Sequence, residues 1–195
     1  MFTQRLQAAA LLLGPAIFSL SPFFWNNGHY GATGGMLIAL SMPPWVYGLI
    51  GEYGRLREHL PRISGIWLFM LLVGILGTVS FGLQGFFEES LGTVGDVSLA
   101  SFSDYPPQSI PLLWLPGPVF PLSLFIFGLM AGWTRIAPRW VAAFICIAAV
   151  AFPAGRVLRL EWVAYAADLL VVLPFAYLAW HAWNRAEDAP GSARV

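Results

Sequence analysis

The stretch from Ile63 to Leu83 reads ISGIWLFMLLVGILGTVSFGL and contains no charged residue. A helix of roughly 20 apolar residues is long enough to cross the hydrocarbon core of a bilayer. Five other stretches have the same character, and each is predicted to be a membrane span: Leu6–Phe24, Gly34–Ile50, Pro116–Trp133, Trp140–Pro153 and Trp162–Trp180. The pattern therefore predicts an all-α protein, a polytopic transmembrane bundle of six helices.

The bulk composition points to the same class. Of the 195 residues, 58% are hydrophobic and 10% are charged, and the mean hydropathy is +0.70. Soluble domains carry about 25% charged residues. We therefore expect one transmembrane domain over residues 1–183, with an external loop at 84–115, and a polar cytoplasmic tail at 184–195. The formal net charge of +0 gives no support for binding to nucleic acid.

The placement of arginine predicts the orientation of the bundle. All 10 basic residues are arginines. With six crossings, one side of the membrane receives most of them, namely Arg5, Arg55, Arg57, Arg62, Arg135, Arg139, Arg185 and Arg194, and the other side receives Arg156 and Arg159. Because cytoplasmic loops carry the excess of positive charge, both termini are expected in the cytoplasm. Arginine without lysine, with abundant Ala, Gly and Pro, is compatible with a bacterial source and hence the bacterial inner membrane.

Prolines and small residues predict how the helices bend and pack. Proline removes a backbone donor inside a helix, so kinks are expected at Pro15, Pro22, Pro43, Pro44, Pro121 and Pro174. On the third span, Gly74, Thr78 and Gly82 recur every four residues. Small residues on one helix face allow close approach of another helix in lipid. That face is predicted to form a tight helix–helix contact.

Asp168 is the only acidic or basic residue well inside a predicted span. It lies about 9 Å along the helix from the external end, and a charged residue at the bilayer centre costs roughly 2.5–3.5 kcal/mol on insertion scales. It therefore needs a partner. Tyr165 and Glu161 share its helix face, whereas Arg159 falls on the opposite face. We expect Arg156, folded back from the loop, to be the arginine that reaches it.

Four hydroxyl residues lie at the same predicted depth as Asp168, and each belongs to a different span: Ser19, Ser41, Thr78 and Ser123. Cys146 shares this depth. One hypothesis places these groups around a polar pocket in the outer leaflet, centred on Asp168, that binds a ligand. In the alternative, each hydroxyl bonds a carbonyl of its own helix and Asp168 fastens two helices together.

Three classes of function remain open at this stage. The first is a small-ligand-binding or accessory and regulatory membrane module, whose partners would be the lipid bilayer, a small apolar or lipid-like ligand, and a partner membrane subunit or a second copy. The second is a transporter of a small solute or a proton-coupled substrate, with Asp168 as the coupling acid. An intramembrane enzyme is less well supported because no nucleophile and base are paired. No cluster has metal-ligand spacing, so neither a metal nor a cofactor is predicted.

Overall fold

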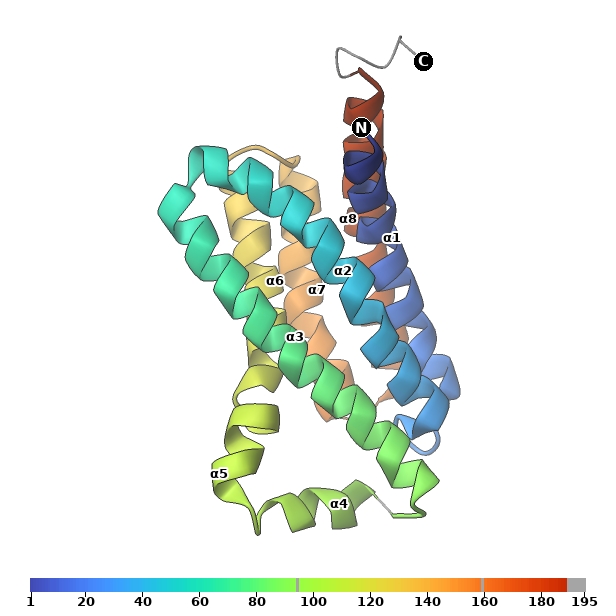
Figure 1. Ribbon diagram of the computed structural model, residues 1–195. Helices are drawn as coiled ribbons and strands as arrows, with labels where there is room; N and C mark the ends of the chain where they lie inside the picture. Colours follow the sequence, from blue (N-terminus) through green and yellow to red (C-terminus); the bar gives the residue numbers. More distant parts are fainter. Residues whose placement is uncertain (94, 159, 189–195) are drawn as a thin grey trace.

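The computed structural model describes residues 1–93, 95–158 and 160–188 (Figure 1). Its elements are α1 (Phe2–Leu20), the 3-10 helix η1 (Ser21–Phe24), α2 (Gly31–His59), α3 (Pro61–Ser90), α4 (Gly95–Phe102), α5 (Pro106–Ser109), the π-helical turn η2 (Ile110–Trp114), α6 (Pro116–Trp133), α7 (Arg139–Val157) and α8 (Glu161–Asp188). No strand occurs in this described part. Six segments are long and apolar enough to cross a membrane, which confirms the predicted number of spans.

The six long helices pack as a ring. Helices α1, α2, α3, α6, α7 and α8 contact one another in chain order, and α8 packs back against α1. The start of α1, the end of α8, the α2–α3 connection and the α6–α7 turn lie at one end, which we call the termini end (Figure 1). The opposite end, the loop end, carries η1, α4, α5 and the last turn of α7 (Figure 1).

The arginines follow this division. Among the described residues, the termini end carries Arg5, Arg55, Arg57, Arg62, Arg135, Arg139 and Arg185, and the loop end carries Arg156. Arg159 and Arg194 lie outside the described residues. The assignment of the termini end to the cytoplasm stays a prediction from this bias.

Helices continue beyond several predicted boundaries. The polar segment Gly51–Arg62 is helical as far as His59, and α3 starts two residues later at Pro61. Helix α3 reaches Ser90, inside the predicted external loop, and α8 reaches Asp188, inside the predicted tail. The predicted boundaries differ because polar residues show only where a helix leaves the hydrocarbon and not where the helix ends. Charged residues spaced three or four apart can stabilise its continuation in water.

Glycines on α3 mark its contacts with two neighbours. A Cβ atom added at Gly74 would lie 2.5 Å from the Phe120 Cα atom of α6, and one at Gly82 would lie 2.7 Å from the Gly35 carbonyl oxygen of α2. Thr78, between them, is buried. The predicted tight contact is confirmed, and the face contacts two helices rather than one.

Aromatic side chains fill the centre of the ring. Trp45 of α2 is fully buried, and its ring centroid lies 5.7 Å from Phe18, 5.2 Å from Phe120 and 5.3 Å from Phe175. Phe152 of α7 adds a stacked contact with Phe18 at 5.3 Å. Edge-to-face and offset contacts at these distances contribute about 0.5–1.5 kcal/mol each beyond the burial of area. Five of the six long helices therefore meet in one aromatic cluster on the bundle axis.

The prolines are accommodated inside continuous helices. Helix α1 contains Pro15, α2 contains Pro43 and Pro44, α6 contains Pro121, α7 contains Pro153 and α8 contains Pro174. Pro22 lies in the first turn of η1, where a missing donor has little effect. The helical assignment runs through each interior proline, and bending at these positions stays a prediction.

Candidate functional site

At the loop end, Asp168 forms an ion pair with Arg156. The two Arg156 terminal nitrogens donate to the two Asp168 carboxylate oxygens at 3.2 and 3.3 Å. Both side chains are nearly fully buried, with 7% and 2% exposed. The predicted partner of Asp168 is thereby confirmed, but its origin differs. Arg156 belongs to the last turn of α7, because that helix continues to Val157, whereas we expected it in the loop.

Aromatic rings enclose the Arg156 guanidinium. Its central carbon lies 4.2 Å from the Phe18 ring centroid, 4.3 Å from that of Phe152 and 5.9 Å from that of Trp25. Within the described residues, the Arg156 Nε atom is buried and has no hydrogen-bond partner. A guanidinium between aromatic faces is stabilised by the ring quadrupole in addition to its carboxylate. The ion pair therefore joins α7 and α8 to Phe18 of α1, which belongs to the central aromatic cluster.

Tyr165 and Glu161, which were predicted to share the helix face of Asp168, have different roles. The Tyr165 hydroxyl donates to the Pro22 carbonyl oxygen at 3.2 Å, and its ring packs on Phe23 at 4.8 Å. Tyr165 thus ties α8 to η1 and does not bond Asp168. Glu161 is exposed at the start of α8. Of these three residues on α8, only Asp168 is paired with Arg156.

The four hydroxyl residues bond carbonyl oxygens of their own helices. The acceptors belong to residues three or four positions earlier: Ser19 to Ala16 at 2.9 Å, Ser41 to Ile38 at 2.6 Å, Thr78 to Gly74 at 3.0 Å and Ser123 to Phe120 at 2.7 Å. This is the geometry of the alternative in which each hydroxyl is satisfied locally. Cys146 instead contacts a neighbouring helix, with its Sγ atom 3.6 Å from the Phe125 carbonyl oxygen. Ligand binding at this depth stays a prediction.

The termini end contains a second buried acid, which sequence reasoning missed. Glu52 of α2 is 2% exposed. Arg55 donates to it at 2.5 Å and to the Ile136 carbonyl oxygen in the α6–α7 turn at 2.8 Å. An Arg185 terminal nitrogen of α8 lies 3.9 Å from the other Glu52 oxygen. The predicted span Gly34–Ile50 ends before Glu52, so the burial of Glu52 was not predicted. Its spacing from the apolar residues Trp45 and Leu49 could have shown that it shares their buried face.

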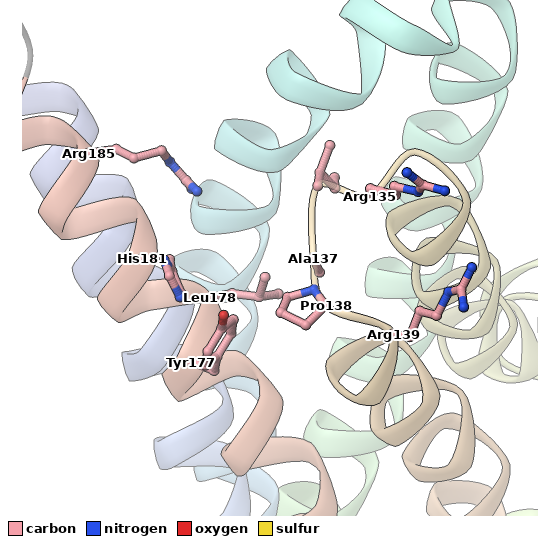
Figure 2. A pocket seen from close by; sticks show the side chains of 9 residues that line it. Arg135, Ala137, Pro138, Arg139, Tyr177, Leu178, His181 and Arg185 are labelled. Carbon is pink, nitrogen blue, oxygen red and sulfur yellow. The ribbon is translucent and has the colours of Figure 1, made fainter.

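A cavity of about 530 Å³ lies beside this network, between the α6–α7 turn and α8. We call it the turn cavity. It is lined by Arg135, Ile136, Ala137, Pro138, Arg139, Tyr177, Leu178, His181 and Arg185. Figure 2 shows Tyr177, His181 and Arg185 on the α8 side and the two turn arginines on the other, with Leu178 and Pro138 between them. A smaller cavity of about 330 Å³ lies between α1, α2 and α8, and Arg185 lines both cavities.

Two arginines of the turn cavity have no anionic partner. Within residues 1–93, 95–158 and 160–188, neither Arg135 nor Arg139 forms an ion pair or a side-chain hydrogen bond, and both are exposed. By contrast, Arg55 and Arg185 at the same end lie against Glu52. The turn side of the cavity therefore carries two arginines that have no counter-ion among the described residues.

Comparison of the chain with protein-family models, with curated proteins and with solved structures found no match. Within the described residues, no group of three or more His, Cys, Asp and Glu side chains is placed to hold a metal ion. The loop end offers a satisfied ion pair, and the termini end offers a cavity with unpaired cations.

Proposed function

We propose that this protein is a membrane-embedded binding module of the accessory or regulatory kind, which holds a small lipid-like ligand in the turn cavity. The observation that carries the proposal is the cavity of about 530 Å³, whose lining combines apolar residues with cationic ones. Ligand sites in proteins usually have volumes of about 300–1,000 Å³, mostly apolar walls and a few polar groups that orient the ligand. An amphiphile matches this division of chemistry.

The interior of the bundle supports binding rather than passage. Trp45 and the phenylalanines around it close the axis of the ring between the two polar ends. A ligand in the turn cavity reaches the termini end without crossing this cluster. The protein would then act by holding or presenting its ligand to a partner, which is an accessory role in the cytoplasmic half of a bacterial inner membrane.

For the loop end we infer a structural role. Arg156 and Asp168 satisfy each other, and the hydroxyls at the same depth bond their own helices. Breaking a buried ion pair leaves an uncompensated charge in a low-dielectric interior, so such a pair holds its helices in one register. The cluster then keeps α1, α7 and α8 together while the opposite end receives the ligand.

The test is to recover the protein with its native lipids and identify bound molecules by native mass spectrometry. Ile136→Trp inserts an indole into the lining of the turn cavity, and the expected result is loss of a bound amphiphile that the unaltered protein retains. Ile147→Trp is the matched control, because Ile147 is 52% exposed on α7 and does not line the cavity. Retention of the same molecule by Ile136→Trp, or its absence from the unaltered protein, would contradict the proposal.

A second candidate function is proton-coupled transport. It is favoured by one observation: buried carboxylates lie on both sides of the aromatic cluster, Asp168 toward the loop end and Glu52 toward the termini end. Such a pathway requires the rings around Trp45 to separate. Proton uptake into vesicles containing the purified protein, abolished by Asp168→Asn, would support transport, and equal uptake by empty vesicles would exclude it.

A further inference from the structure

The charge around the turn cavity is of one sign. Its lining includes Arg135, Arg139, Arg185 and His181, and no acidic side chain. Glu52 lies 3.9 Å from Arg185 and offsets that charge in part. The two arginines of the turn retain their full charge. A ligand that fits this cavity therefore carries negative charge on the side facing Arg135 and Arg139.

The start of α7 adds a second attraction for an anion. Pro138 is the residue before the first turn, and no side chain caps the helix there. The first turn contains no acidic residue, and it begins with Arg139. The free N–H groups of a helix N-terminus and its dipole favour negative charge. The same dipole repels the Arg139 guanidinium. An anion bound between this guanidinium and the free N–H groups would offset the repulsion and accept hydrogen bonds from those groups.

Arg135 has an unusual backbone conformation. It follows the last turn of α6 with a φ angle of 59°, in the left-handed region. Glycine is the usual residue where a helix ends in this conformation, because any other residue is strained there. Glycine would therefore be more stable than arginine at this position. Within the described residues, the Arg135 side chain forms no ion pair that would stabilise the fold. Its charge remains available to a ligand.

Exposed tryptophans near the turn cavity favour a position at the level of the lipid headgroups. Trp133 at the end of α6 is 81% exposed, Trp140 at the start of α7 is 49% exposed, and Trp180 on α8 is 58% exposed. Exposed tryptophans at the ends of membrane spans occupy the interface between hydrocarbon and water. These three residues surround the two helix ends and the segment of α8 that form the cavity.

We propose that the anionic group of the ligand is a phosphate ester, bound by Arg135 and Arg139 and by the free N–H groups at the start of α7, with His181 and Arg185 on the opposite wall. This inference rests on the proposed function and names the chemical class of its ligand. A planar carboxylate is satisfied by one bidentate arginine, whereas a phosphate has several oxygens in a tetrahedral arrangement and can accept from donors in different directions. Basic sites between membrane helices at the cytoplasmic side bind phospholipid headgroups by this chemistry.

The same chemistry has two sources: the headgroup of an anionic phospholipid, or a soluble phosphate compound that enters from the aqueous side. Two arms of one experiment separate them. In the first, the full chain is placed in nanodiscs of phosphatidylcholine with increasing phosphatidylglycerol, and bound lipid and thermal unfolding are measured. In the second, inorganic phosphate and glycerol 3-phosphate are titrated into the protein in pure phosphatidylcholine nanodiscs.

The variant Arg135→Gln/Arg139→Gln removes the two unpaired cations. A direct hydrogen bond to a charged group contributes a factor of about 10 or more, so the loss of two such contacts should weaken binding by about 100-fold in whichever arm shows it. Arg57→Gln/Arg62→Gln is the matched control, because it removes the same charge at the same end from exposed residues that line neither cavity. If the first variant fails to fold, Arg135→Gly/Arg139→Gln removes the same charges and the left-handed strain.

Binding in either arm that is lost in the cavity variant and kept in the control supports the phosphate assignment, and the arm identifies the source. Equal loss in both variants overturns it, because general surface charge would then explain the effect. Absence of binding in both arms also overturns it. If a neutral amphiphile nevertheless occupies the unaltered protein and is displaced by Ile136→Trp, the proposed function stands and only the phosphate assignment fails. If no molecule is bound at all, both fail.

Discussion

The buried ion pair at the loop end makes the sharpest prediction about stability. Asp168→Asn removes one charge and leaves the Arg156 guanidinium in a site where its side chain is 7% exposed. Removing one partner of a buried pair costs about 3–5 kcal/mol, mostly because the remaining charge has no counter-ion. At about 2–4 °C per kcal/mol for a chain of this size, the melting temperature should fall by about 6–20 °C.

The double variant Arg156→Met/Asp168→Leu distinguishes the contribution of the ion pair to stability from the contribution of ordinary packing. It removes both charges, so the penalty for an unpaired charge disappears, and the contacts of the guanidinium with Phe18 and Phe152 are lost, at about 2 kcal/mol. The double variant is therefore expected to be more stable than either single variant, and the difference from additivity measures the coupling.

The assay is reversible unfolding of the purified protein in mixed micelles, followed by intrinsic fluorescence, with thermal melts as a second readout. Glu161→Gln is the control, since Glu161 is exposed on the same helix and forms no ion pair within the described part of the chain. Two results would refute the reasoning: an unchanged melting temperature in Asp168→Asn, or a double variant whose loss equals the sum of the single losses.

Four further variants test the packing and the termini end. Gly74→Ala places a Cβ atom 2.5 Å from the Phe120 Cα atom and should destabilise by about 1–3 kcal/mol, whereas Gly65→Ala, with nothing within 4 Å, should be neutral or stabilising by up to about 1 kcal/mol in the same melts. Arg135→Gly should raise stability by about 1 kcal/mol, because glycine tolerates a φ angle of 59°; a loss would show that the arginine stabilises the fold. Glu52→Gln should cost about 1–3 kcal/mol, because Arg55 and Arg185 are partly exposed and can reach water when the charge of Glu52 is removed. It should also increase proteolysis at the α6–α7 turn, because Glu52 holds Arg55 against the Ile136 carbonyl oxygen of that turn; an unaltered cleavage pattern would contradict this role of Glu52.

Much of the fold could be predicted because the bilayer imposes local rules. A span needs a run of apolar residues, and Ile63–Leu83 supplies one without reference to any other part of the chain. The face of Gly74 and Gly82 could be recognised because small residues in lipid have little other purpose than close packing. Asp168 required a partner on energetic grounds, and helix periodicity left Arg156 as the arginine that reaches it.

The candidate site depended on facts that no single segment contains. The direction of a serine hydroxyl is set by competition between its own helix and its neighbours, and Ser41 and Ser123 bond within their helices. Glu52 looked like part of a polar connection because several charged residues follow it closely in the sequence. Its burial results from the packing of α2 against α1 and from the approach of Arg185 on α8.

Residue order alone therefore established the class of the protein, the number of its spans, the grouping of its arginines and the need to neutralise one buried acid, since each follows from apolar length or from the energy of charge in lipid. Three-dimensional packing established that the α6–α7 turn faces α8 across a cavity, and that Arg135 and Arg139 have no counter-ion in the part of the chain that the structure describes. The physical reason is that a cavity belongs to the space between helices. Its shape and charge depend on how residues distant in the chain are brought together.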